Sequence, residues 1–132
     1  MKMPATLRLV KRCAEYLEAA QVFDLPGGLR GIYVLYRQRR RAGRVFRDVV
    51  YVGMASRGGI RARLKNHRLK KAGAWTHFSV FEVWDNIRDE EVTELEGLFR
   101  HLYRYDSKAN ALNSARSYKA LKSLRDNRLE SW

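Results

Sequence analysis

Two stretches in the first half of the chain, residues 31–37 and 48–53, are rich in β-branched and aromatic residues, and the segment between them is polar. This pattern is typical of a β-hairpin. Ala42-Gly43 lies near the middle of the polar segment, and glycine suits a turn that needs a positive φ. A turn centred near Ala42 predicts that Tyr33 faces Tyr51, with Cβ atoms roughly 5 Å apart. A bulge would shift this register.

The remaining pattern predicts three helices, a third strand and a basic tail. Apolar residues recur at helical spacing in residues 4–21, 60–71 and 88–104. Residues 75–84 are predicted as a strand with apolar residues on both faces, which indicates a sheet that is covered on both sides. Residues 115–131 form a basic, helix-like tract.

Length and charge limit the possible roles of the chain. Its 132 residues suit one domain spanning 1–132. With 27 Lys and Arg against 14 Asp and Glu, the net charge is +13, which favours a polyanionic partner and nucleic acid above all. An anionic membrane surface or a ribosome would share that charge preference.

Cysteine and apolar content point to the inside of the cell. Cys13 is the single cysteine, which excludes an intramolecular disulfide, and no Cys and His cluster has the spacing of a structural zinc site. No apolar run approaches a membrane span, and charges interrupt the region where a signal peptide needs its apolar core. We expect a soluble, cytoplasmic protein.

The tip of the predicted hairpin is rich in arginine. Six guanidinium groups lie within eleven residues: Arg37, Arg39, Arg40, Arg41, Arg44 and Arg47. Like charges at this density repel one another unless an anion lies nearby. The tip is either a solvated loop or a phosphate-binding finger, and the overall charge favours the finger. The predicted nucleic-acid contacts are Arg39, Arg40, Arg41 and Arg44, together with Lys70 on the next helix.

Three polar residues on the predicted helices are candidates for chemistry. Arg63 and His67 lie one turn apart on the same side of a helix and could reach one phosphate together. Each also has a simpler interpretation, Arg63 as a solvated side chain and His67 as a hydrogen-bonded core histidine. Glu96 lies at the margin of an apolar stripe, whereas Glu94 points to the opposite side. An inward carboxylate is costly unless it meets a cation, such as Arg100 one turn on, or a metal.

Taken in order, these residues resemble the motif of the GIY-YIG nuclease family. The matching residues are Gly31-Ile32-Tyr33, Tyr51-Val52-Gly53, Arg63, His67, the helical Glu96 and a later asparagine. The resemblance covers about residues 31–113. It implies a small α/β (α+β) domain with a three-stranded antiparallel sheet flanked by helices and a core of about residues 29–113, to which the helix 4–21 and the tract 115–131 are added.

The resemblance also implies a reaction, the Mg²⁺-dependent hydrolysis of DNA phosphodiester bonds. Tyr33 or Tyr51, assisted by His67, would orient or deprotonate the attacking water, and Arg63 would stabilise the charge that builds up at phosphorus. Glu96 would hold one Mg²⁺, with Mn²⁺ as an alternative. Asn113 would brace the site, although the proline that often lies nearby is missing and Asn110 is an alternative. RNA as a substrate stays open.

A second hypothesis explains the same composition without catalysis. A basic DNA- or RNA-binding module would use the arginine-rich tip and the C-terminal tract for phosphate contacts. Glu96 separates the two hypotheses, because a pure binding module gains nothing from an inward acid in a field of positive charge.

Overall fold

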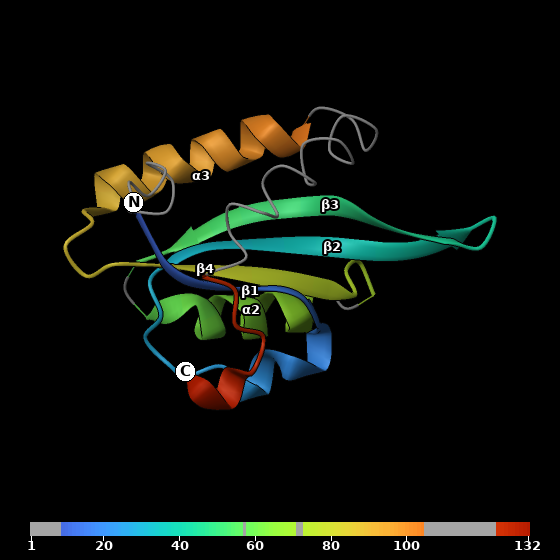
Figure 1. The fold of residues 1–132 in the computed structure, drawn as a ribbon, viewed down its shortest axis with the longest axis horizontal. Helices are drawn as coiled ribbons and strands as arrows, with labels where there is room; N and C mark the ends of the chain where they lie inside the picture. The colour runs from blue at the N-terminus through green and yellow to red at the C-terminus, as the bar shows by residue number, and fades with distance from the viewer. Residues whose placement is uncertain (1–8, 57, 71–72, 105–123) are drawn as a thin grey trace.

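The computed structural model describes residues 9–56, 58–70, 73–104 and 124–132. They form an α+β fold, a four-stranded antiparallel sheet with the strand order β1-β4-β2-β3. One helix covers each face of the sheet (Figure 1). Within this part of the chain, no helix has both the length and the apolar character that crossing a membrane requires.

The sequence-predicted central elements are present. The strands are β1 (Val10–Glu18), β2 (Gly31–Arg41), β3 (Arg44–Ala55) and β4 (His77–Val83), and the helices are α2 (Gly59–Lys70) and α3 (Asp89–Arg104). There are also two short 3₁₀ helices among the described residues. η1 (Ala19–Asp24) follows β1, and η2 (Leu129–Ser131) is the last element. The hairpin of β2 and β3, the strand β4 and both central helices therefore confirm the predictions for these segments.

Alternate residues of β2 enter two different cores, because successive side chains of a strand point to opposite faces. Tyr33 and Leu35 pack with the α2 residues Ile60 and Leu64. On the other face, Ile32, Val34 and Tyr36 belong to a second buried cluster, which includes Val92 and Leu95 of α3. The continuous burial of residues 31–36 and the two apolar faces of β4 have this common cause.

The predicted register of the hairpin is wrong. Tyr33 pairs with Gly53, and Tyr51 pairs with Leu35. The turn is centred between Ala42 and Gly43, which both have positive φ (52° and 75°), as the two-residue loop of a type I′ hairpin requires. A bulge between Leu35 and Tyr36 adds a further residue to the offset. Tyr33 and Tyr51 still share one face, because a shift of two residues preserves the alternation.

The predicted N-terminal helix over residues 4–21 is also wrong in the part that can be compared, since Val10–Glu18 is the strand β1. Its register shifts between Val10 and Arg12 and again between Ala14 and Leu17. Such irregularities break the period of two and leave Val10, Cys13, Ala14 and Leu17 buried at spacings of three, one and three. That spacing imitates a helix. The sheet consequently has four strands rather than the predicted three.

The C-terminal helical prediction needs a similar correction. Residues 115–123 lie outside the described part, and the chain from Leu124 onward runs beside β1 instead of forming an α-helix. The amide of Cys13 donates to the Leu124 carbonyl (3.1 Å), and the amide of Asp126 donates to the Cys13 carbonyl (2.8 Å). We call residues 124–132 the C-terminal strap. It occupies hydrogen-bonding groups on the outer edge of β1, which would otherwise be open to another chain.

Candidate active site

The site is built around Tyr33, whose side chain is almost completely buried (1% exposed). Its ring lies over Gly53 in the neighbouring strand β3. A Cβ atom at position 53 would lie 2.5 Å from both Cζ and the hydroxyl oxygen of Tyr33, and 2.7 Å from Cε1 of Tyr51. Because β3 is the outermost strand on this side of the sheet, the missing side chain lets the phenol reach over the sheet edge.

Three rings meet at this edge. The hydroxyl oxygen of Tyr33 is hydrogen-bonded to Nε2 of His67 at 2.9 Å. The ring centroids of Tyr33 and Tyr51 are 6.0 Å apart, those of Tyr33 and His67 are 5.6 Å apart, and those of Tyr51 and His67 are 4.7 Å apart. The two tyrosines are therefore diagonal neighbours and not the directly facing pair that was predicted. A diagonal contact is within reach of aromatic rings, and His67 is in contact with both.

Helix α2 is held in place at its start. A Cβ atom on Gly59 would lie 2.7 Å from the backbone nitrogen of Gly28, so that the two backbones touch in a way only glycine allows. The amide of Ile60 donates to the carbonyl of Leu29 (2.8 Å), just before β2 begins. Ile60 and Leu64 are fully buried against the sheet, and His67, half-buried, lies one turn beyond Leu64 towards Tyr33.

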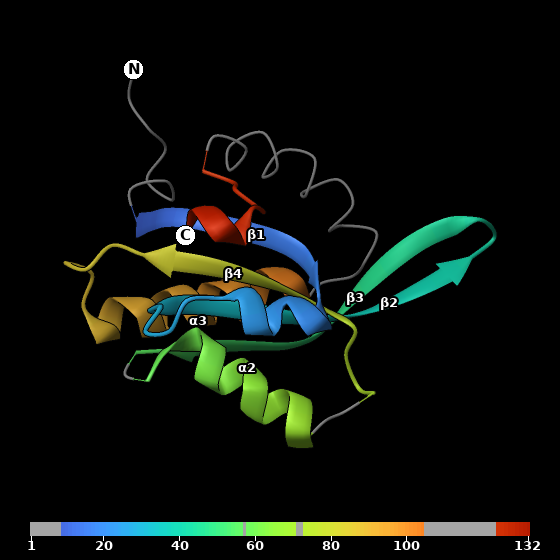
Figure 2. The same ribbon diagram turned by 90° about the horizontal axis from the view of Figure 1, so that it is seen from below.

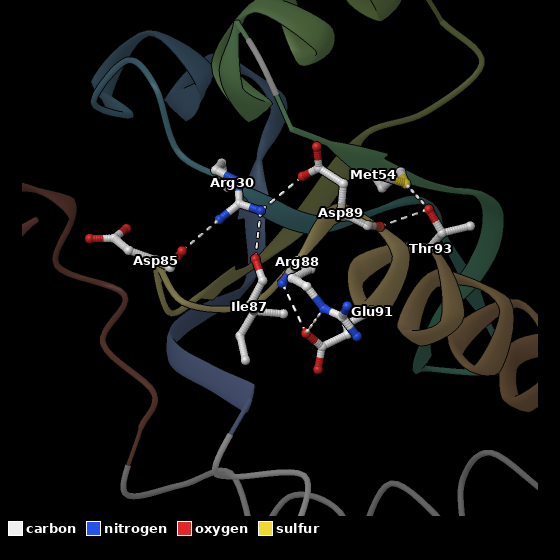
Figure 3. A network of polar contacts seen from close by, with 8 residues as sticks. All are labelled: Arg30, Met54, Asp85, Ile87, Arg88, Asp89, Glu91 and Thr93. Carbon is white, nitrogen blue, oxygen red and sulfur yellow. Dashed lines mark hydrogen bonds and ion pairs between the residues drawn. The ribbon is translucent and has the colours of Figure 1, made fainter.

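Helix α3 is fixed by a polar network around Arg30, the residue that precedes β2 (Figure 3). The Nη2 atom of Arg30 donates to the Ile87 carbonyl (2.7 Å) and to Oδ1 of Asp89 (2.8 Å). Its Nη1 atom donates to the Asp85 carbonyl (3.5 Å). One guanidinium group thus ties the start of β2 to the first residue of α3 and to the loop before it.

Two further contacts fix the first turns of this helix (Figure 3). The carboxylate of Glu91 accepts from the backbone amide of Arg88 (3.1 Å), which is one of the two hydrogen bonds of a capping box. The hydroxyl of Thr93 lies 2.9 Å from the Asp89 carbonyl and 3.2 Å from the sulfur of Met54. Met54 follows Gly53 directly. This contact therefore attaches α3 to β3 next to the glycine over which the Tyr33 ring lies.

Glu96 follows Thr93 by three residues and lies on the same side of α3. It is half-buried, whereas Glu94 is exposed, as the phase of the apolar stripe predicts. Glu96 belongs to α3 and His67 to α2, and these helices lie on opposite faces of the sheet (Figure 1). The open edge at Gly53 is where the two faces meet.

Electrostatics connect these groups at the Tyr33 hydroxyl. Burial raises the pKa of Tyr33 well above its usual range, and the neighbouring Tyr51 raises it further. The positive charge of Arg63 lowers this pKa, and the negative charge of Glu96 raises it. Both charged side chains therefore act on the same phenol, although their helices lie on opposite faces of the sheet. Tyr33 is held in its protonated form at neutral pH.

The predicted nucleic-acid contacts occupy two surfaces. Arg40, Arg41 and Arg44 are exposed at the tip of the hairpin, which projects from the body of the molecule (Figures 1 and 2). Arg39 is engaged within the hairpin, where its Nε atom lies 2.6 Å from Oδ2 of Asp48 and its guanidinium stacks over the Phe46 ring. Lys70 is exposed at the end of α2. Asn113 and its alternative Asn110 lie outside the described residues.

The donor chemistry of the site suits a magnesium-type ion with few protein ligands. Among the described residues, no three acidic, His or Cys side chains gather closely enough to enclose a metal. Glu96 is the half-buried carboxylate that acts on Tyr33. Mg²⁺ is commonly held by one or two carboxylates while keeping several waters and binding substrate phosphate, and Mn²⁺ also prefers oxygen ligands. The residues present therefore fit such an ion.

Sequence reasoning missed the residues that orient the site. Arg30 and Asp89 are 59 residues apart, and Met54 and Thr93 are 39 apart, so no periodicity connects them. Gly53 was included in the sequence analysis only as part of a resemblance. The spatial reason for this glycine, the ring of Tyr33 above it, depends on a register that was predicted wrongly.

Comparisons with known proteins add no relative. No protein-family model matches the sequence, no curated protein matches it, and no solved structure matches it. Function therefore has to be argued from the residues of the site.

Proposed function

We propose that this protein is a metal-dependent endonuclease of the GIY-YIG type that hydrolyses phosphodiester bonds in DNA. The observation that carries the proposal is the convergence on the Tyr33 hydroxyl. A hydrogen bond of 2.9 Å joins it to His67, and the charges of Arg63 and Glu96 both act on it. These side chains come from three separate elements of the fold, β2, α2 and α3.

The raised pKa of Tyr33 favours a relay over a phenolate base. In the proposed step, the attacking water gives a proton to the hydroxyl oxygen of Tyr33 while the phenol gives its own proton to Nε2 of His67. The phenol remains neutral throughout, so the cost of ionising a buried tyrosine is avoided. His67 ends as an imidazolium, which is an accessible state near neutral pH for a histidine side chain. Tyr51, which stacks on the Tyr33 ring and packs at a tilt against the His67 ring, holds both in this orientation.

The remaining groups stabilise charge. Arg63 is exposed one turn before His67, on the same side of α2, where its guanidinium can bind oxygens of the scissile phosphate as they become more negative. Glu96 would hold the divalent ion, which when bound supplies Lewis-acid stabilisation of the leaving 3′ oxygen. Positioning and electrostatic stabilisation are the main contributions that a protein makes to phosphoryl transfer.

The test is the conversion of supercoiled plasmid to nicked or linear DNA by the purified protein. We expect cleavage with Mg²⁺ or Mn²⁺ and none with EDTA. Glu96→Gln should lower the rate by on the order of 100-fold or more, as the removal of one electrostatic stabiliser does elsewhere. The matched control Glu94→Gln, at an exposed position on the same helix, should keep the wild-type rate.

Two outcomes count against the proposal. Cleavage that persists with both EDTA and Glu96→Gln would overturn the mechanism and leave a nuclease of another kind. Intact plasmid under all conditions, together with salt-sensitive DNA binding, would favour the second candidate function, a basic binding module without catalysis. The observation that favours this module is the exposed row of arginines on the projecting hairpin, which needs no active site in order to bind phosphate.

A further inference from the structure

A second basic surface lies on the flank of α2 that faces away from the proposed active site. Phe23, in η1, is 57% exposed. Nζ of Lys65 lies 5.5 Å from the centre of its ring, and Cζ of Arg68 lies 4.9 Å from it. No carboxylate of the described segments forms an ion pair with either cation. Phe23 therefore presents an exposed aromatic ring beside two positive charges that no carboxylate of the described residues neutralises.

This surface is distinct from the catalytic one, although the same helix carries both. Arg61, Lys65 and Arg68 recur at intervals of four and three, and therefore form one stripe along α2. The centre of the stripe that contains Arg63 and His67 is turned by roughly 150° from it, because each residue advances about 100° around the axis. The buried residues Ile60 and Leu64 lie between the two stripes on the inner side.

A small hollow adjoins the stripe. It has a volume of about 150 Å³ and is lined by Gly27, Gly58, Arg61, Ala62 and Lys65. One part of its wall is backbone and the methyl group of Ala62, and the other part is formed by the cations Arg61 and Lys65. A negatively charged oxygen could therefore approach closely. Arg61 is oriented by a contact of its Nη1 atom with the carbonyl of Leu25 (3.4 Å). The hollow and the ring of Phe23 share Lys65 as a common neighbour.

We propose that Phe23, Arg61, Lys65 and Arg68 bind single-stranded DNA, with an unpaired base stacked on Phe23 and the adjoining phosphate at the cationic hollow. Aromatic rings within a positive groove bind successive bases of single strands, since every base has a π-face. A base inside a duplex is already stacked on both sides and cannot use the ring. This surface therefore binds an unpaired segment of DNA and not a duplex.

The inference rests on the proposed function, and it specifies the kind of DNA substrate. A strand that leaves the catalytic stripe can cross the outer surface of α2, where Ala62, Asn66 and Leu69 are exposed, and reach Phe23. The crossing is short because a helix with its side chains is only about 10 Å wide. A branched, nicked or flapped DNA would offer duplex to the arginine-rich hairpin and an unpaired strand to Phe23.

The test measures binding in EDTA, so that no cleavage is required. Fluorescence anisotropy is recorded with a labelled oligodeoxythymidine and with a blunt duplex of the same length. Phe23→Ala should weaken binding of the single strand about tenfold, the order expected for the loss of one stacked base, and leave duplex affinity within about twofold. Phe23→Tyr, which keeps the ring, should retain single-strand affinity. Thermal unfolding confirms that each variant is folded.

A salt titration separates the contribution of the positive charges to binding from that of the Phe23 ring. Arg61→Ala with Lys65→Ala removes both cations of the hollow and should reduce the slope of log affinity against log salt for the single strand by about 0.7, the contribution of the one phosphate placed there. Equal losses of Phe23→Ala on single strand and duplex, or no loss on either, would overturn the inference. Plasmid cleavage that depends on Glu96 would still stand in that event, and a lack of cleavage would leave the binding result intact, so the two failures are distinguishable.

Discussion

The phenol of Tyr33 lies over the backbone of Gly53, in the space that a side chain at position 53 would fill. This relationship lets a buried residue of β2 reach across the outer strand β3 to the edge of the sheet. At that edge it meets His67 from one face and the charge of Glu96 from the other. The pairing of a tyrosine with a glycine in the adjacent strand is thus the structural condition for the whole site.

Gly53→Ala tests this condition. The added methyl group would lie 2.5 Å from the Tyr33 hydroxyl and 2.7 Å from the Tyr51 ring, so both rings have to move. Overpacking of this kind typically costs about 1–3 kcal/mol in the free energy of unfolding. We expect plasmid cleavage to fall to background at temperatures where the variant remains folded, since the contact of Tyr33 with His67 depends on the position of the ring.

Gly97→Ala is the matched control. Apart from its chain neighbours and the helix backbone, no atom of the described residues lies within 4 Å of the Cβ position at Gly97, which is in the body of α3. Alanine should raise stability there by roughly 0.5–1 kcal/mol, because glycine is entropically costly within a helix. Urea unfolding and the plasmid assay on both variants provide the comparison. Full activity of Gly53→Ala would contradict the proposal that the missing side chain at position 53 makes room for the Tyr33 ring.

The titration of Tyr33 gives a prediction for stability at high pH. A tyrosine in the unfolded chain has a pKa near 10, and burial, aided by Tyr51, raises the pKa of Tyr33 in the folded protein. The folded state therefore holds this proton more tightly, which stabilises the protein fully below about pH 10. That stabilisation is lost as the pH rises through the folded-state pKa.

Tyr33→Phe removes this dependence. The free energy of unfolding of the wild type should exceed that of Tyr33→Phe at neutral pH by on the order of 1 kcal/mol, for the lost hydrogen bond to His67. The difference should shrink as the pH rises above about 10, because only the wild type loses the contribution of Tyr33. Urea titrations at a series of pH values measure it. A stability difference that grows with pH would contradict the expected loss of the Tyr33 contribution at high pH.

How far the sequence could predict this fold depended on whether a segment kept a regular period. Helix α3 keeps its period, and the β2–β3 hairpin departs from its period at one place, between Leu35 and Tyr36; both elements were predicted. Strand β1 does not, because two register shifts and a positive φ of 58° at Tyr16 place its buried residues at helix-like spacing. The identity of β1 as a strand comes from its pairing with β4, whose residues are 59–73 positions away along the chain, and local propensity does not contain this information.

For the candidate site as well, features set by local spacing were predicted and features set by distant contacts were not. The half-buried position of Glu96 followed from its phase on α3, and the pair of Arg63 and His67 followed from their spacing on α2. The approach of groups from both helices to the Tyr33 hydroxyl did not follow. It depends on the contacts of Arg30 with the start of α3 and of Thr93 with Met54, which link distant parts of the chain.

The arginine-rich hairpin is expected to bind DNA through phosphates without regard to sequence. Replacing Arg40, Arg41 and Arg44 by Ala together removes three exposed charges from the projecting tip. If all three contact phosphates of a duplex, the slope of log affinity against log salt should fall by about 2.7, at about 0.9 per contact. Anisotropy titrations with a blunt duplex at several salt concentrations measure this slope.

Arg39→Ala is the control for charge at the same tip. Its guanidinium is already bound to Asp48 at 2.6 Å and stacked over Phe46 at 4.6 Å, so its loss removes one ion pair as well as one positive charge. We expect a change in slope of less than about 0.9. A triple variant that binds with the wild-type slope would show that the hairpin projects into solvent without contacting DNA.

The C-terminal strap should stabilise the fold without contributing to the site. The side chain of Asn127 accepts from the Glu15 amide and donates to the Glu15 carbonyl, each at 3.0 Å. Asn127→Ala leaves both backbone groups on the edge of β1 without these partners and should cost about 1–3 kcal/mol in the free energy of unfolding. Asn86→Ala, at an exposed turn, should change it by less than about 0.5 kcal/mol.

Strand order separates the strap from the proposed chemistry. β1 and β3 are opposite edges of the sheet, with β4 and β2 between them, so a change at the β1 edge has two strands to cross before it reaches Gly53. Folded Asn127→Ala should therefore cleave plasmid at the wild-type rate at low temperature and lose activity only as it unfolds on heating. A loss of cleavage well below the unfolding temperature would mean that the strap shapes the site through the sheet, in conflict with an active centre confined to the β3 edge.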